Sequence, residues 1–301
     1  MTGAPDVSTV APLSTVDPPR EWRGLVDLGE MRALVGDAVA RGAARQWAVD
    51  DLDWAALRPE RLTRNDRSAV RFLTFIEDHI PGYLTYFLEL FPLTGAESVE
   101  EFCFNREYFR FLVAWAYDEE RHATVLTRYQ VDAGITDADT LMVDLAEEGR
   151  KKFTLPHGEP VQAFTYALVQ EKATQLFYQR FREVVREPLL RDLLSRLARD
   201  EARHFAFYSR LVEAYVARHG LARTVPDLKD VLASFKMPLA DTLRGYWRWS
   251  LQMADDVGYD HTEAYDALVR LVNGFGDSRG EASAADLAEF AHRLRGIEPG
   301  R

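Results

Sequence analysis

The sequence lacks several features that would place it in common classes of protein. Cys103 is its single cysteine, which excludes a disulfide framework and a zinc site built on paired thiolates. Such sparing use of cysteine is typical of a reducing compartment, and we expect a cytoplasmic protein. No run of about 18 apolar residues occurs, so we expect no membrane insertion. The first basic residue is Arg20, so no secretory or transit signal is expected.

An excess of basic side chains is also missing. The 301 residues include 48 acidic and 37 basic side chains, which gives a formal net charge of -11. A general nucleic-acid binder would carry the opposite excess, so we expect no nucleic acid as a partner. Hydrophobic residues make up 47% of the chain, which is enough to form a sizeable core and excludes a mostly disordered protein.

Strand signals are scarce, because apolar and polar residues do not alternate over any long stretch. Apolar residues recur instead at spacings of three and four, which predicts an all-α protein. In the helix expected over 62–92, Pro81-Gly82 predicts a kink and not an end. Helices are expected over residues 28–46, 62–92, 97–133, 138–152, 159–185, 187–219, 227–236, 240–255, 262–274 and 283–295.

The chain divides into three expected parts. Residues 1–24 are rich in Pro, Thr, Ser and Val and are predicted to form a disordered N-terminal arm. Residues 25–275 are predicted to form a single helical domain. Residues 276–301 begin with a Gly- and Ser-containing stretch and are predicted to form a loosely attached C-terminal segment.

Four of the predicted helices are long enough to form a bundle, and each has an ionisable residue within its apolar stripe. A buried carboxylate or imidazole is costly unless it is paired or bound to a metal. The set comprises two single glutamates and two Glu-x-x-His pairs, whose spacing places Glu and His on one helix face. The candidate metal ligands are Glu77, Glu119, His122, Glu171, Glu201 and His204.

This combination is the ligand set of carboxylate-bridged di-iron and di-manganese four-helix bundles. The pentapeptide Asp-Glu-Glu-Arg-His at 118–122 recurs as Asp-Glu-Ala-Arg-His at 200–204, which indicates a pseudo-two-fold bundle. A third Glu-x-x-His, from Glu289 to His292, lacks this context and is interpreted as surface charge. The sequence therefore predicts a ferritin-like four-helix di-iron bundle with additional flanking helices.

Residues 45–240 resemble the soluble acyl-[acyl-carrier-protein] desaturase family. The segment Phe-Ile-Glu-Asp-His-Ile-Pro-Gly-Tyr at 75–83 is similar to the family's first ligand helix. The later motifs follow in the family's order. They are Glu-Glu-Arg-His at 119–122, Gln-Glu-Lys-Ala-Thr at 170–174, Asp-Glu-Ala-Arg-His at 200–204 and Lys-Met-Pro at 236–238.

The resemblance implies an O₂-dependent desaturase that inserts a cis double bond into an acyl chain carried on acyl carrier protein. It implies two iron ions (Fe²⁺/Fe³⁺) per chain, with Glu119 and Glu201 as bridges and the other four candidates as terminal ligands. Thr174 is implied to handle protons beside the oxygen-binding face. The alternative is a hydroxyl hydrogen-bonded back to its own helix. Trp47 resembles a tryptophan that the family uses in a hydrogen-bonded relay to the site.

Asp118 and Asp200 precede the two bridging glutamates. They suit acceptors for the ligand imidazoles of the opposite helix, which would fix the tautomer of each ring. The aromatic residues near the ligands are candidates for the walls of an apolar substrate channel. These candidates are Trp115, Phe164, Tyr178 and Tyr208.

Electrons are expected from another protein, because the chain has no nucleotide-binding βαβ unit and no cysteine cluster. The resemblance implies a ferredoxin as the donor and a homodimer. Ferredoxin and acyl carrier protein are acidic, so basic residues should be concentrated locally. Candidates are the 150–152 run (Arg-Lys-Lys) and the Arg180, Arg182 and Arg186 group; a solvated surface is the alternative.

Three other functions are open on the sequence alone. The first is a di-iron N-oxygenase or hydroxylase that acts on a biosynthetic intermediate such as an amine or a small aromatic. The second is a non-catalytic iron- or oxygen-handling protein of the ferritin class. The third is a helical bundle with a purely structural role.

Overall fold

The structure is a computed structural model that describes residues 26–246, 248, 257–274 and 281–295. The arm expected over 1–24 and half of the helix expected over 240–255 lie outside these residues. Residues 240–245 form turns, so the expected helix does not begin at 240. The described residues form helices and no strand, which confirms the predicted all-α class. The α-helices are α1 (Leu28–Ala43), α2 (Arg64–Glu77), α3 (Ile80–Leu90), α4 (Val99–Asp132), α5 (Ala138–Gly149), α6 (Pro160–Val184), α7 (Pro188–His219), α8 (Leu221–Ser234), α10 (Tyr265–Asn273) and α11 (Glu281–Arg295).

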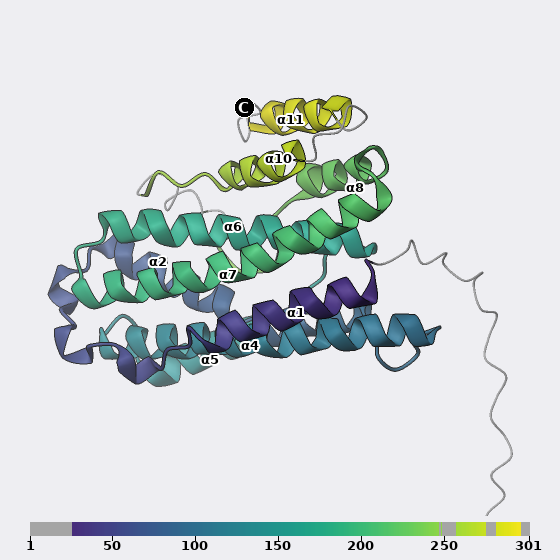
Figure 1. Ribbon diagram of the computed structural model, residues 1–301. Helices are drawn as coiled ribbons and strands as arrows, with labels where there is room; N and C mark the ends of the chain where they lie inside the picture. The colour runs from purple at the N-terminus through teal and green to yellow at the C-terminus, as the bar shows by residue number, and fades with distance from the viewer. Residues whose placement is uncertain (1–25, 247, 249–256, 275–280, 296–301) are drawn as a thin grey trace, which may run out of the picture.

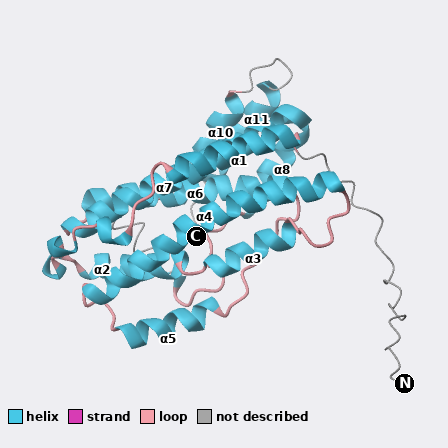
Figure 2. Ribbon diagram, turned by 60° about the horizontal axis from the view of Figure 1, so that its bottom comes forward, coloured by secondary structure: helices cyan, strands magenta, loops and turns pink. Residues whose placement is uncertain are grey.

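Helices α2, α4, α6 and α7 surround the centre of the molecule (Figure 1). α6 and α7 are antiparallel and lie side by side, because only the short link over 185–187 connects them. α2 packs against α4, and α1 contacts both α4 and α7. α8, α10 and α11 form a further layer beyond α6 (Figure 1). α5 lies at the edge of the bundle, where Asp144 accepts a hydrogen bond from Arg71 of α2 (Figure 2).

Local signals set the ends of the two longest helices. The Ser98 hydroxyl accepts a hydrogen bond from the Glu101 backbone N–H at 3.1 Å, so it caps α4. Gly134 and Gly220 follow α4 and α7 with φ angles of 59° and 81°, which glycine adopts without strain. These caps fix both ends of α4 and the C-terminal end of α7, the two helices that carry the Glu-x-x-His pairs.

The helix expected over 62–92 is in fact two helices, so the predicted kink was wrong. α2 ends at Glu77, Asp78 and His79 form a turn, and α3 begins at Ile80. Pro81 has no N–H to donate to a preceding turn, and it is tolerated in the first turn of a new helix. Gly82 permits this turn, because a Cβ at that position would collide with the His79 ring. Glu77 therefore lies at a helix end.

The core is rich in aromatic rings between α4 and α7. The hydroxyls of Tyr108 and Tyr208 lie 3.1 Å apart, and the Phe111 and Phe207 rings stack with centroids 3.5 Å apart. At the C-terminal end, α11 buries Leu287 against α8 and α10. The division of the chain into an arm, one domain and an attached segment stays a prediction.

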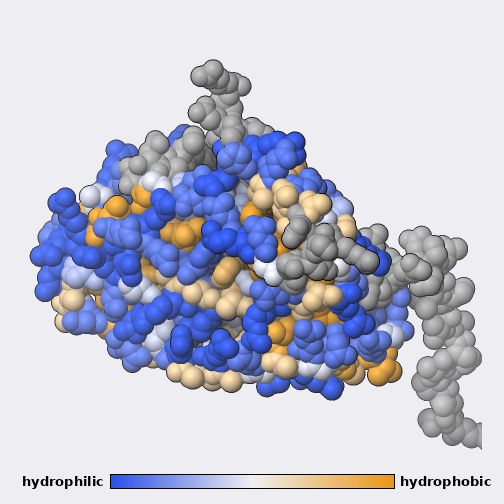
Figure 3. All heavy atoms as spheres, turned by 45° about the horizontal axis from the view of Figure 1, so that its top comes forward, coloured by the Kyte–Doolittle hydropathy of each residue, from blue (hydrophilic) through white to orange (hydrophobic). Residues whose placement is uncertain are grey.

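The outer surface is mainly hydrophilic on the face shown in Figure 3, with hydrophobic residues gathered in separate patches. Among the described residues, no helix combines the length and the apolar character needed to cross a bilayer.

Candidate metal centre

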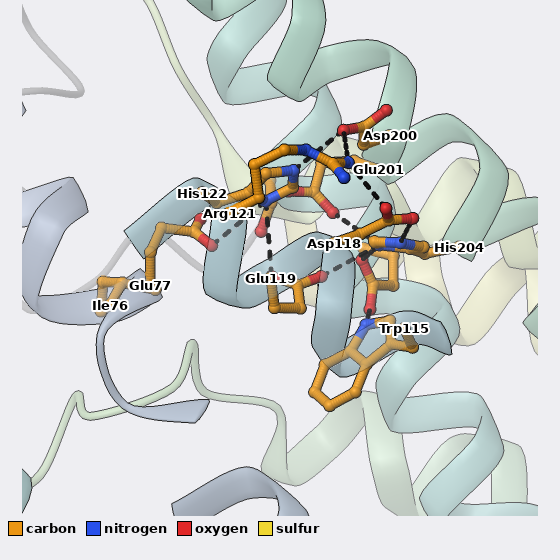
Figure 4. A network of polar contacts seen from close by, with 12 residues as sticks. Ile76, Glu77, Trp115, Asp118, Glu119, Arg121, His122, Asp200, Glu201 and His204 are labelled. Carbon is orange, nitrogen blue, oxygen red and sulfur yellow. Dashed lines mark hydrogen bonds and ion pairs between the residues drawn. The ribbon is translucent and has the colours of Figure 1, made fainter. Parts of the chain in front are cut away.

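Six ionisable side chains from α2, α4, α6 and α7 converge in the middle of the bundle (Figure 4). All six are between 0% and 5% exposed. They form two groups, and within each group one ligand atom per residue lies within 4.8 Å of the others. Glu119 and Glu201 belong to both groups. The first group adds Glu77 and His122, and the second adds Glu171 and His204.

His122 is the centre of the first group. Its Nδ1 atom lies 3.5 Å from a carboxylate oxygen of each of three residues, Glu77, Glu119 and Glu201. These residues come from three helices, since Glu77 ends α2, Glu119 shares α4 with His122, and Glu201 lies on α7. One imidazole nitrogen therefore faces three carboxylates in a buried site.

His204 is the centre of the second group. Its Nδ1 atom lies 3.0 Å from Glu119, 3.4 Å from Glu171 and 3.2 Å from Glu201. Glu171 is on α6 and His204 is on α7. The two groups have the same construction, and each shared glutamate directs one oxygen toward each histidine.

The opposite nitrogen of each imidazole faces an aspartate on the other Glu-x-x-His helix. His122 Nε2 lies 3.2 Å from Asp200, and His204 Nε2 lies 3.4 Å from Asp118. A carboxylate at this position favours a proton on Nε2, which leaves the Nδ1 lone pair directed into the cluster. The sequence suggested this crossed pairing; the aspartates' effect on the reaction stays a prediction.

Two arginines neutralise these aspartates. Arg121 donates to Asp118 at 2.6 Å and to Asp200 at 2.9 Å, and Arg203 lies 3.1 Å from Asp118 and 2.5 Å from Asp200. Their positive charge holds both aspartates ionised, although burial opposes ionisation. Contacts with His122 and Arg203 accordingly hold the pKa of Asp200 well below its usual range.

The residues present fit a pair of bound cations. Four ligand-type atoms are buried with no partner in hydrogen-bond geometry: Glu119 Oε1, His122 Nδ1, Glu171 Oε2 and Glu201 Oε1. Burial, partly offset by the contact with His122, raises the pKa of Glu77 to about 7. Burial and the charge of Glu119 raise the pKa of Glu201 well above its usual range. Four carboxylates packed this closely need positive charge between them, and divalent cations supply it.

Two buried aromatic residues, whose contacts the sequence did not reveal, hold the terminal carboxylates. The Tyr178 hydroxyl donates to Glu77 Oε1, and Trp115 Nε1 donates to Glu171 Oε1 at 3.1 Å. Trp115 precedes Glu119 by one helical turn, so the spacing placed it on the ligand face without showing its partner. Phe164 and Tyr208, the other expected channel walls, are also buried, and the wall role of all four stays a prediction.

The remaining expected site residues lie close to the cluster. Trp47 is half-buried, and its Nε1 donates to Asp200 Oδ2 at 2.8 Å. Thr174 is buried, and its hydroxyl donates to the Gln170 carbonyl at 3.1 Å, which is the alternative arrangement that the sequence left open. The third Glu-x-x-His pair is exposed on α11, where Glu289 lies 3.9 Å from Arg293.

Residues 60–271 match the model of a family described as fatty acid desaturase. The chain belongs to this fatty acid desaturase family. One relative, DesA2 of Mycobacterium tuberculosis, is provisionally named an acyl-[acyl-carrier-protein] desaturase. It is 26% identical over 151 residues, which make up 50% of this chain and 51% of DesA2. The resemblance drawn from the motifs is therefore confirmed.

A plant member of the family is also similar to this chain. Acyl-[acyl-carrier-protein] desaturase 6, chloroplastic, of Oryza sativa subsp. japonica is 29% identical over 221 residues, covering 67% of this chain and 49% of that protein. The matches thus span about half the length of these curated relatives.

The X-ray structure of DesA2 from Mycobacterium tuberculosis has a similar fold. It aligns with a TM-score of 0.56 and 20% identity, and the alignment covers 86% of this chain and 98% of that one. The predicted ferritin-like fold is confirmed. The family supports an oxidoreductase, and the buried glutamate and histidine cluster suits a metal site.

Proposed function

We propose that the protein is an O₂-dependent di-iron desaturase that inserts a cis double bond into an acyl chain carried on acyl carrier protein. One observation carries the proposal: two Glu/His groups share Glu119 and Glu201 inside a chain of the fatty acid desaturase family. The names of the curated relatives support the carrier-bound substrate.

In this proposal the six converging residues hold two iron ions. Glu119 and Glu201 would contact both ions, Glu77 and His122 would help to hold one, and Glu171 and His204 would help to hold the other. The bound irons would supply the redox chemistry that reduces O₂ and removes two hydrogen atoms from neighbouring methylenes.

The chain's own residues hold this centre in place and exclude water. Tyr178 and Trp115 fix the terminal carboxylates, and Asp200 and Asp118 fix the imidazoles. The aromatic core beside the cluster provides an apolar environment, which an unactivated methylene requires. Thr174 is proposed to hold a proton at its Oγ1 atom, for which the hydroxyl would turn away from the Gln170 carbonyl.

The proposed electron donor is a ferredoxin, and the protein is proposed to act as a homodimer. Trp47, Asp200 and His122 form a continuous line of contacts from a half-buried indole to the cluster, with steps of 2.8 Å and 3.2 Å. This line supports delivery of electrons from the side of the molecule where Trp47 lies.

The proposal is tested by incubating the iron-loaded protein with ferredoxin, its reductase, O₂ and stearoyl- or palmitoyl-carrier protein. Mass spectrometry of the released acyl chain should show the loss of two hydrogen atoms. Addition of an oxygen atom would indicate a hydroxylase instead, and an unchanged acyl chain at every length tried would refute the desaturase proposal.

A further inference from the structure

A cleft of about 250 Å³ lies between α1 and α7, beside the metal centre. The residues that line it share one face of each helix, from Leu34 to Arg41 along α1 and from Arg199 to Arg210 along α7, and Arg45 follows just beyond the end of α1. Three small residues, Ala38, Ala202 and Ala206, occupy the lining where larger side chains would close the gap. The hollow is therefore a consequence of the sequence of these two helices.

The cleft is lined by five arginines and a single acidic residue, Asp37. Asp37 lies 2.9 Å from Arg41 and also pairs with Arg210. Among the described residues, no carboxylate lies within ion-pair distance of Arg45 or Arg199, both of which are exposed. The five arginines are Arg41, Arg45, Arg199, Arg203 and Arg210. The cleft therefore carries uncompensated positive charge in a chain whose net charge is -11.

Of the six basic residues that stood out in the sequence, three are paired with a carboxylate. Lys151 lies 2.5 Å from Glu148, Lys152 lies 3.3 Å from Glu89, and Arg180 lies 2.6 Å from Glu263. Exposed ion pairs of this kind leave little net field for a ligand to recognise. The α1–α7 cleft, by contrast, brings five arginines together around one hollow with a single acidic residue.

The cleft is linked to the metal centre through Arg203. This arginine lines the cleft and also contacts Asp118 and Asp200, which face the two ligand histidines. A second hollow of about 100 Å³ shares Ala38 and Arg203 with the cleft and is also lined by His204. Arg203 would thus lie between a molecule bound in the cleft and the two aspartates that orient the imidazoles.

We propose that this cleft binds a small organic anion, with a carboxylate or phosphate group on a short apolar body, and that Arg203 couples its binding to the metal centre. Guanidinium groups pair with planar or tetrahedral oxyanions through charge-assisted hydrogen bonds. The apolar part of the lining, which includes Leu34 and Phe207, suits a short hydrocarbon body. A hollow of this size holds a small molecule, whereas a stable protein interface needs a much larger surface. The coupling rests on the proposed metal function, but the binding does not.

The binding is tested by calorimetric titration of the full-length, metal-loaded protein at low ionic strength. The probes are hexyl phosphate, hexanoate, inorganic phosphate and hexanol. At least one of the two amphipathic anions should bind at one per chain, about tenfold more tightly than inorganic phosphate, because its hydrocarbon body is buried. Hexanol should not bind. The tighter of the two anions identifies the headgroup, and failure of both to bind would overturn the proposal.

Two kinds of variant locate the site. Replacing both Arg45→Gln and Arg199→Gln should weaken binding about a hundredfold, because two charge-assisted contacts are lost. Ala202→Leu should also abolish binding by filling the cleft while keeping every charge. Arg191→Gln is the matched control, because Arg191 is exposed on α7 outside the cleft. Unchanged affinity in both the double variant and Ala202→Leu would place the anion elsewhere and overturn the assignment.

The coupling has its own readout, the rate at which bound ferrous ion is released to a chelator. Saturating anion should change that rate several-fold in the wild-type protein and not in the Arg45/Arg199 double variant. Equal rates with and without bound anion would refute the coupling. A protein that binds iron normally but no anion overturns this inference alone, whereas one that binds no iron overturns the proposed function.

Discussion

The two halves of the metal centre are built alike around their histidines and differently around their terminal carboxylates. His122 and His204 face Asp200 and Asp118 at similar distances of 3.2 Å and 3.4 Å. Glu171, however, lies inside the 25-residue helix α6, whereas Glu77 is the last residue of α2. Helical turns on both sides hold the backbone of Glu171, but a turn follows Glu77.

The donors to the two terminal carboxylates differ in the same way. Trp115 offers Glu171 an indole N–H, which can only donate, whereas Tyr178 offers Glu77 a hydroxyl, which can donate or accept. A helix end and a hydroxyl that can reverse its role allow more rearrangement than a helix interior and an indole. We therefore expect the Glu77 half to be the more adaptable half of the centre.

Removing a shared glutamate should have the largest effect, because it affects both halves at once. In Glu119→Ala we expect the loss of both metal ions and of activity, with bound iron per chain measured by mass spectrometry of the metal. Glu289→Ala is the matched control, because that exposed Glu-x-x-His pair on α11 should not bind metal. Normal iron content in Glu119→Ala would contradict the shared role.

Removing one terminal carboxylate should affect one half only. We expect Glu77→Ala and Glu171→Ala each to retain about one metal ion per chain, measured in the same way. Glu171→Ala also leaves the buried Trp115 N–H unpaired, so it should cost about 1–3 kcal/mol of the free energy of unfolding. If either variant loses both ions, the two halves are not independent in the way described.

Replacing the aspartates tests the feature that the two halves share, the carboxylate that faces each ligand histidine. Asp200→Asn and Asp118→Asn should each weaken metal binding roughly 10- to 100-fold, because each ligand imidazole loses its charged acceptor. Competition with a chelator of known affinity measures the metal affinity of both variants. A large effect in only one variant would show that the similarity of the two histidine environments is superficial.

The smallest expected effect comes from the hydrogen-bond donors. Tyr178→Phe and Trp115→Phe should each lower metal affinity by about fivefold, the usual effect of one buried hydrogen bond. Tyr178→Phe should speed metal release more than Trp115→Phe does, because Glu77 lacks a following helical turn. Stopped-flow measurement of iron release to a chelator compares them, and the reverse order would contradict the proposed difference between the halves.

Much of the fold and the convergence of the six side chains could be predicted from the sequence. Helical spacing placed each ionisable residue on an apolar face, and the repeated pentapeptide related α4 to α7. The break after Glu77 could not be predicted in the same way, because Pro81 is compatible with a kink as well as with a new helix start. The packing of Gly82 against His79 decides between them, and that contact exists only in the folded turn.

Apart from the crossed aspartate–histidine pairs, contacts between helices could not be predicted from the sequence. Spacing places Trp115 and Tyr178 on inward faces, but not opposite particular carboxylates on other helices. Likewise, Lys152 appeared to belong to a basic cluster, whereas Glu89 from a distant part of the chain pairs with it. The arginines of the α1–α7 cleft are dispersed along two distant segments, so no local run of basic residues in the sequence indicated the cleft.

The central claim is that two metal ions occupy the space between the six converging side chains. A crystal of the protein grown anaerobically with ferrous salt and measured at the iron absorption edge tests it directly. We expect two anomalous peaks per chain, one beside His122 and one beside His204, with Glu119 and Glu201 contacting both. Peaks elsewhere, or no peak between these residues, would contradict the claim.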